Sequence, residues 1–110
     1  MSTSIPRGNI LKVFAIAITA DVTSRTLSTS TEFDFTVPGV KVGDIVIAIN
    51  KPSLSAGLVV GTGRVKAADT VAVTFGNCTA GGVDPASETY TFVIGRAEFP
   101  STSLPTIFNA

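Results

Sequence analysis

The 110-residue sequence contains no histidine and no tryptophan, and it has a single cysteine, Cys78. Without histidine, neither a Ser-His-Asp nor a Cys-His nucleophilic site can be assembled within one chain. A single cysteine forms neither an intramolecular disulfide nor a multi-thiolate metal centre, and we expect Cys78 to be a packed, unreactive thiol. The sequence therefore predicts no enzyme, no catalytic residues, no cofactor and no metal site.

Charge is also scarce, because only 15% of the residues are charged and the eight basic and eight acidic residues sum to zero. Soluble domains usually carry about a quarter charged residues. Lysine and arginine are scattered, whereas a protein that binds nucleic acid or an anionic membrane needs them clustered. We therefore expect neither a nucleic-acid nor a membrane partner, and the low charge suggests that protein partners cover part of the surface.

The sequence also lacks a recognisable targeting signal. Residues 1–7 lack the charged and apolar regions of a secretory signal, and the apolar run over residues 13–20 is too short to cross a bilayer. We expect synthesis in the cytoplasm.

What the sequence does contain is a series of short segments in which apolar and polar or small residues alternate. Alternation with a period of two places one face of an extended strand inward and the other outward. In residues 88–96, for example, it turns Tyr90 inward. The six predicted strands cover residues 9–19, 32–37, 44–50, 58–66, 70–77 and 88–96. An all-β fold follows, and strands at this spacing favour a sandwich or barrel.

Three of these segments carry finer predictions. Residues 9–19 would also fit a buried helix by length, but Val13, Ile16 and Ile18 are β-branched and no cap is present, which favours a strand. Residues 44–50 are apolar on both faces, which predicts a central strand. The short connection Lys66-Ala-Ala-Asp-Thr70 predicts a hairpin that pairs its flanking strands antiparallel.

The two ends differ from the middle, so we divide the chain into an N-terminal arm (1–8), a β domain (9–97) and an extended C-terminal arm (98–110). Two prolines in the last segment rule out a regular helix there. The segment also carries Phe99, Leu104, Ile107 and Phe108, which we predict to be partner-binding residues because a solvated tail gains nothing from them. It either crosses to a neighbouring subunit or folds back over a sheet edge of its own domain.

Several acidic residues and short motifs resemble parts of functional sites, but none of them has the other residues that such a site requires. A carboxylate pair or a calcium loop needs additional ligands at a fixed spacing, which the isolated acids do not provide. Gly61-Thr-Gly-Arg64 lacks the remaining residues of a phosphate-binding loop, and Asn77-Cys-Thr79 fits the glycosylation tripeptide by chance. The discounted acids are Asp34, Asp44, Asp69, Asp84 and Glu88.

Three stretches carry a resemblance to a known group of proteins: Phe35-Thr-Val-Pro-Gly-Val-Lys-Val-Gly-Asp44, Arg64-Val-Lys-Ala-Ala-Asp-Thr-Val-Ala-Val-Thr-Phe-Gly-Asn77 and Val83-Asp-Pro-Ala-Ser-Glu-Thr-Tyr-Thr-Phe-Val-Ile94. Across about two-thirds of the chain, this pattern resembles small virion structural proteins of tailed bacteriophages, most closely capsid decoration (cement) proteins. The resemblance implies a β-sandwich or jelly-roll-like barrel of about six to eight mainly antiparallel strands.

The same resemblance also implies a function. A protein of this group forms a homotrimer, binds the major capsid protein on the outside of the capsid and stabilises the virion. It is made in the host cytoplasm. Two alternatives stay open, namely a β module of a phage tail or fibre and a carbohydrate-binding β-sandwich. The absence of tryptophan and the inward position of Tyr90 leave a sugar site without an evident stacking platform.

Overall fold

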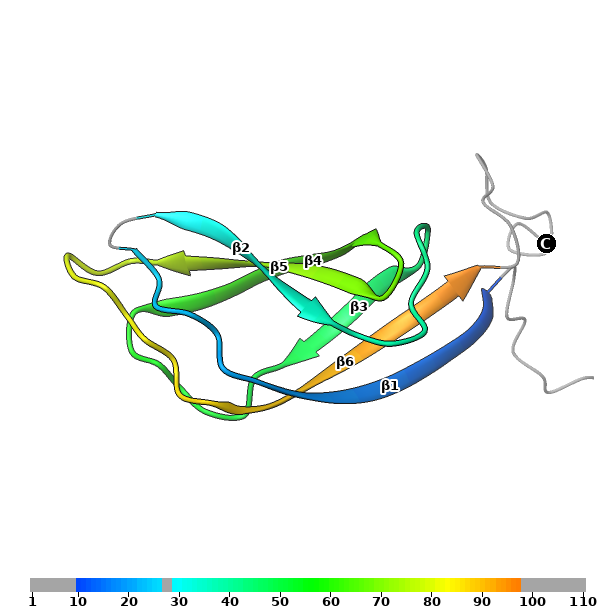
Figure 1. The fold of residues 1–110 in the computed structure, drawn as a ribbon, viewed down its shortest axis with the longest axis horizontal. Coiled ribbons are helices and arrows are strands. Elements are labelled where there is room, and N and C mark those ends of the chain that lie inside the picture. The colour runs from blue at the N-terminus through cyan, green and yellow to red at the C-terminus, as the bar shows by residue number, and fades with distance from the viewer. Residues whose placement is uncertain (1–9, 27–28, 98–110) are drawn as a thin grey trace, which may run out of the picture.

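The computed structural model describes residues 10–26 and 29–97, and these residues form six β-strands and no helix (Figure 1). All six strands match segments predicted from alternation, including the first, for which a helix was the alternative. The strands are β1 (Ile10–Ala20), β2 (Ser30–Thr36), β3 (Ile45–Asn50), β4 (Leu58–Ala67), β5 (Thr70–Asn77) and β6 (Glu88–Ala97). The predicted arms, residues 1–8 and 98–110, lie outside the described residues, as do Phe99, Leu104, Ile107 and Phe108.

The strands pair into two three-stranded sheets, in the orders β1-β6-β3 and β2-β5-β4, and every pair is antiparallel. Only β4 and β5 are joined by a hairpin, and that pairing confirms the prediction from residues 66–70. Its turn residue Asp69 has a positive φ of 61°, and its carboxylate accepts a hydrogen bond of 2.8 Å from the amide of Gly39. The hairpin tip is thereby tied to the loop that follows β2.

The two sheets share one apolar core, so the arrangement is sandwich-like (Figure 1). Alternation supplies the core residues from both sheets, since the inward positions of β5 and β6 are fully or almost fully buried. The largest of the fully buried side chains are Tyr90, Phe35, Phe75, Phe92 and Ile94. Tyr90 faces inward, as predicted.

The hydroxyl of Tyr90 is buried without a hydrogen-bond partner among the described residues. Burial, and then the negative charges of Glu88 and Asp21, raise the pKa of this phenol, so the hydroxyl stays neutral. A buried polar group without a partner costs stability. We therefore expect Tyr90→Phe to raise the free energy of unfolding by about 1 kcal/mol, measured by urea denaturation followed by circular dichroism.

The matched control is Phe92→Tyr, which adds a hydroxyl at the next inward position of β6. It should lower the free energy of unfolding. A loss of stability in Tyr90→Phe would contradict the prediction and would mean that this hydroxyl has a partner.

The prediction that residues 44–50 form a central strand is wrong. β3 pairs only with β6 and is the edge of its sheet, and Ile45 and Ile47 are 57% and 56% exposed. The pairing of β3 with β6 also shifts between Val46 and Ala48, so that Val46 and Ile49 face the core while Ile47 lies at a bulge. The apolar residues on the outer side of β3 are therefore exposed, and no other described part of the chain covers them.

Candidate functional site

The outer face of the β1-β6-β3 sheet contains no charged side chain among its described residues. Residues directly opposite one another in an antiparallel pair point to the same side of the sheet, so the register assigns the members of this face. We call it the charge-free face. Its members are Val13, Ala15, Ala17 and Thr19 from β1, Thr89, Thr91, Val93 and Gly95 from β6, and Ile45, Ile47, Ala48 and Asn50 from β3.

The most exposed large apolar side chains of this face lie on its two edge strands, whereas Val93 on the central strand is half-buried. Val13 on β1 is 56% exposed, and Ile45 and Ile47 on β3 are exposed to the same degree. Between them the central strand carries Gly95, where an added Cβ would lie 3.0 Å from Cδ1 of Ile47. A side chain at residue 95 would therefore require Ile47 to shift by a few tenths of an ångström, and glycine leaves Ile47 room to lie across β6. The face is therefore apolar along both edges, with Gly95 and the half-buried Val93 on the strand between them.

The outer face of the other sheet provides an internal comparison. Across the β2-β5-β4 sheet, Arg64 binds Glu32 through two hydrogen bonds of 2.7 and 2.9 Å, and Lys66 lies 2.7 Å from Asp34. The hydrogen bonds from Arg64 lower the pKa of Glu32. Ala72 lies in register between Asp34 and Arg64 and is fully buried, because the paired side chains cover it. One face of the domain thus has the charged side chains of a solvated surface, and the other has none.

The edge strands differ in the same way. β2 carries Glu32 and Asp34, β4 carries Arg64 and Lys66 and has two irregularities, and β3 is short and bulged. Charges and bulges of this kind block pairing with another chain. β1 is the longest strand, its register is unbroken from Lys12 to Ala20, and Lys12 is the only charged residue in it. Of the four edge strands, β1 is therefore the least protected against pairing with another chain, and it borders the charge-free face.

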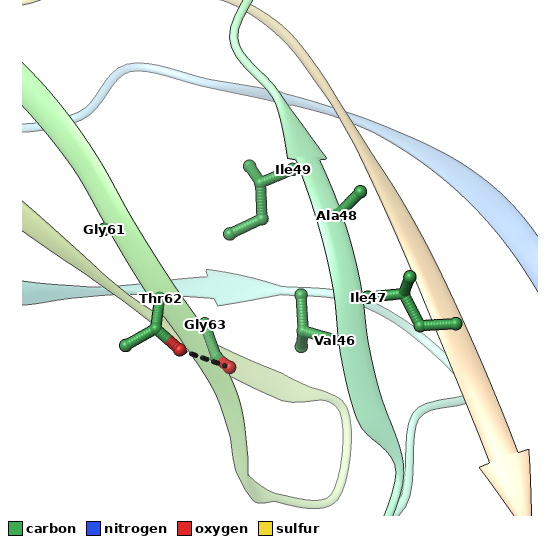
Figure 2. A pocket seen from close by; sticks show the side chains of 7 residues that line it. All are labelled: Val46, Ile47, Ala48, Ile49, Gly61, Thr62 and Gly63. Atoms are coloured by element: carbon green, nitrogen blue, oxygen red, sulfur yellow. Dashed lines mark hydrogen bonds between the residues drawn. The ribbon is translucent and has the colours of Figure 1, made fainter.

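A cleft of about 250 Å³ lies between β3 and β4, where the edges of the two sheets meet (Figure 2). Val46 and Ile49 point from β3 toward β4, whereas Ile47 points to the β6 side. The β4 wall is largely backbone, because Gly61 and Gly63 have no side chains there. A Cβ on Gly63 would lie 3.0 Å from Cδ1 of Ile49 and 3.1 Å from Cγ1 of Val46. The cleft is lined by Val46, Ile47, Ala48, Ile49, Gly61, Thr62 and Gly63.

Four of the five discounted carboxylates, those of Asp34, Asp44, Asp69 and Glu88, have structural contacts. Asp34 and Asp69 have the contacts described above. Glu88 accepts hydrogen bonds from the amide and hydroxyl of Ser53, and Nζ of Lys51 lies 2.8 Å from its Oε2. These contacts lower the pKa of Glu88 despite the opposing effect of burial. Asp84 is exposed, and no three acidic or cysteine side chains within residues 10–26 and 29–97 come together as a metal site would require.

Asp44 is held most firmly of these acids. Arg96 donates to it from Nε at 2.9 Å and from Nη2 at 2.7 Å, and the amide of Lys41 donates at 2.9 Å. The Arg96 hydrogen bonds are the largest cause that lowers the pKa of this carboxyl. Arg96 also donates to the carbonyl of Gly39 and lies 5.8 Å above the ring of Phe14. The pair joins β6 to the loop before β3.

Two further predictions concern Asn77, the last residue of β5, and Cys78, which follows it. Cys78 is exposed, so the prediction of a packed thiol is wrong. Its backbone amide bonds the carbonyl of Gly57 while its side chain points outward. Asn77 is buried, and its amide group donates to the carbonyls of Arg25 and Gly81. A glycan on Asn77 would break these bonds.

The residues that the sequence marked as partner-binding all lie in the C-terminal segment, beyond the described part of the chain. The exposed apolar residues of the charge-free face, by contrast, were assigned to strands but not to a binding surface. A signal was present, since the outward positions of residues 13–17 are valine and alanine where a solvated strand has polar side chains. Within the described ranges, no helix is long and apolar enough to cross a membrane.

No family model, curated protein or solved structure matches this chain.

Proposed function

We propose that this chain is a structural protein of a tailed-phage virion that binds the outside of the capsid and stabilises it as a decoration, or cement, protein. It acts as a homotrimer, and its β-sandwich or jelly-roll-like body is bound to the major capsid protein. The proposal includes neither an enzymatic activity nor a cofactor, nucleic-acid or membrane partner. The observation that carries it is the charge-free face, which lies opposite a face with two ion pairs.

Depletion of charge distinguishes the core of a protein–protein interface from the rest of a surface. The charge-free face meets this description, and its half-exposed isoleucines and valine gain free energy when a partner removes them from water. Its threonines and asparagine supply hydrogen-bonding groups without the desolvation cost of full charges. An exposed sheet face of this kind fits another protein surface better than it fits a small molecule, which needs a concave site.

Multivalency explains how modest contacts would suffice on a particle. A homotrimer presents three copies of the face to a lattice of repeating capsid subunits, and each bound copy raises the effective concentration of the next. The affinity of the trimer then exceeds that of one face without any additional type of contact. The resemblance to phage decoration proteins supports the same assignment.

The carbohydrate-binding alternative loses support from the position of Tyr90, because this single tyrosine is fully buried and cannot stack on a sugar. A tail or fibre module would use the same charge-free face. The site of attachment on the particle separates that alternative from the capsid, and electron microscopy of particles decorated with gold-labelled protein measures it.

The test of the proposal is Val93→Lys, which places an ammonium group at the centre of the charge-free face. We expect it to weaken binding to capsid shells of the encoding virus at least tenfold, since one unpaired charge in an interface costs more than 1.4 kcal/mol. Co-sedimentation of purified protein with the shells, over a range of protein concentrations, measures the change.

The matched control is Thr74→Lys, which adds the same charge to the outer face of β5, the central strand of the other sheet. Thr74 is half-buried, as Val93 is. The control variant should bind as the unmodified protein does. Equal binding of all three proteins, or no binding of the unmodified protein to shells, would refute the proposal.

A further inference from the structure

β1 is an edge strand whose outer side has no partner strand among the described residues. It pairs only with β6, and the two strands stay in register from Lys12 to Ala20. In an antiparallel sheet, every second residue of an edge strand turns its amide and carbonyl away from the neighbouring strand. Figure 1 shows β1 along the lower margin of the domain. Such an edge is a template on which another strand can pair.

The inward side chains of β1 also lack full cover. Phe14, Ile16 and Ile18 pack against the core but are only half-buried. The residues opposite them on β6 are fully buried, namely Ile94, Phe92 and Tyr90. The difference arises because β6 has a strand on each side and β1 has one on a single side. A strand added beside β1 would remove its remaining apolar surface from water.

A second β1 is complementary to this edge, because two identical strands can pair antiparallel about a twofold axis. Opposite residues point to the same side of the sheet, so the axis passes through one residue of β1. The in-register part of β1 overlaps completely with its copy only when that residue is Ile16. Ile16 then lies opposite Ile16 of the second copy, and Phe14 lies opposite Ile18. On the other side of the sheet, Ala15 lies opposite Ala17, where both side chains are small.

The charges at the two ends of β1 favour the same arrangement. Lys12 begins the in-register part of β1 and Asp21 follows its last residue, and both side chains are exposed. Neither makes an ion pair with another residue of the described ranges. Antiparallel pairing centred on Ile16 places Lys12 opposite Ala20 of the second copy, next to its Asp21. Parallel pairing would instead bring like charges together, which is unfavourable.

We propose that β1 pairs antiparallel with β1 of a second copy, centred on Ile16, and so joins two three-stranded sheets into one sheet of six strands. The contact uses the same strand in both copies, so it is isologous and leaves neither β1 edge free. The two charge-free faces then lie on the same side of the joined sheet. The inference goes beyond the proposed function, since it requires no capsid. In a homotrimer, the twofold contact joins copies that belong to two different trimers.

Cysteine cross-linking on the full chain tests the register. The two proteins are Ala15→Cys and Ala17→Cys, each also carrying Cys78→Ser because Cys78 is exposed. Opposite residues of an antiparallel pair have Cα atoms about 4.5 or 5.5 Å apart, which a disulfide can span. We therefore expect an equal mixture to form a mixed disulfide dimer under mild oxidation, identified by mass spectrometry. Each protein alone should form little, since its two cysteines lie on a diagonal about 7–8 Å apart.

Two cross-linking results would overturn the inference. One is the absence of the mixed dimer, whether the β1 edge stays open or another segment covers it. The other is a disulfide that either protein forms with itself as readily as in the mixture, because the axis would then pass through residue 15 or residue 17.

Charge variants test whether the contact holds the copies together. Ala15→Glu/Ala17→Glu places carboxylates opposite each other twice across the contact, and like charges directly opposite are destabilising. We expect the dissociation constant of the contact, measured by analytical ultracentrifugation, to rise at least tenfold. Ala15 and Ala17 are exposed, and an unchanged circular dichroism spectrum would establish that the variant is folded.

The matched control is Ala15→Lys/Ala17→Glu, which changes the same two positions but places opposite charges across the contact. It should dissociate at least tenfold less readily than Ala15→Glu/Ala17→Glu. Equal dissociation of the two variants, or an odd number of copies in the unmodified protein at saturating concentration, would overturn the inference.

The outcomes separate this inference from the proposed function. If the mixed dimer forms but the protein does not bind capsid shells, the proposed function falls and the inference stands. If the protein binds shells but the mixed dimer is absent, the inference falls and the proposed function stands.

Discussion

Phe35→Ala should lower the free energy of unfolding by about 4 kcal/mol. Phe35 is 1% exposed and lies at the centre of an aromatic cluster that joins the two sheets. Its ring centroid lies 4.9 Å from that of Tyr90 and 5.1 Å from that of Phe92, both on β6, and both pairs are edge-to-face. On its own sheet the ring contacts Phe33 and Phe75.

The size of the expected loss follows from the position of this ring. Truncation to alanine removes the apolar surface buried by the side chain and leaves a cavity between two sheets whose hydrogen bonds limit how far they can close. Domains of this size have a total stability of only about 5–15 kcal/mol. The variant should therefore unfold at a much lower urea concentration, with the slope of the transition unchanged.

Phe35→Leu is the matched control, because it keeps a large apolar side chain and should lose less than about 1.5 kcal/mol. The protein has no tryptophan, so far-ultraviolet circular dichroism is the appropriate probe. If Phe35→Ala lost less than Phe35→Leu, the cluster would not be the centre of the core.

The strands and the inward residues could be predicted from the sequence because both depend on local patterns. Alternation in residues 70–77 and 88–96 distinguishes the core side from the other side whatever the partner strand is, and the short link at 66–70 restricts the following strand to a hairpin. The other pairings could not be predicted in this way. β1 pairs with β6, which is separated from it by four strands, and no local pattern in either strand specifies that choice.

The error over β3 shows where pattern reasoning fails. An apolar run on both faces indicates burial on both faces only if every apolar residue has a partner within the same chain. In β3 a bulge at Ile47 reverses the expected alternation, and the outward residues have no such partner. The charge-free face likewise becomes visible only when the register brings Val13, Val93 and Ile45 onto one surface.

The second large effect is expected from Arg96→Met. This substitution leaves Asp44, whose side chain is only 4% exposed, without its guanidinium partner. A carboxylate buried without its counter-ion is strongly destabilising, and we expect the free energy of unfolding at pH 7 to fall by about 3 kcal/mol. Methionine keeps an unbranched apolar side chain at position 96, but it removes the guanidinium group from Asp44, from the carbonyl of Gly39 and from the ring of Phe14.

The double variant Arg96→Met/Asp44→Leu is the control that separates the loss of the pair from the isolated charge. Replacement of a buried ion pair by apolar residues is often close to neutral. We therefore expect the double variant to be more stable than Arg96→Met alone. If both variants lost the same free energy, the cost would come from the other contacts of Arg96, with Gly39 and Phe14, and not from the unpaired carboxylate.

The pH dependence gives a second measurement of the same interaction. Arg96 and the amide of Lys41 hold the pKa of Asp44 below its ordinary value of 3.8 in the folded protein. A carboxyl whose pKa is depressed by folding stabilises the fold above that ordinary value, and this contribution is lost as the pH falls through the folded pKa. The stability difference between the unmodified protein and Arg96→Met should therefore be largest at neutral pH and shrink below about pH 4.

The pKa values of Glu32 and Glu88 are also lowered, but both carboxylates are present in the unmodified protein and in the variant. A stability difference between these two proteins that narrows on acidification therefore reports on Asp44. A difference that stays constant from pH 7 to pH 3 would mean that the ionised carboxylate of Asp44 contributes nothing to the stabilisation by Arg96.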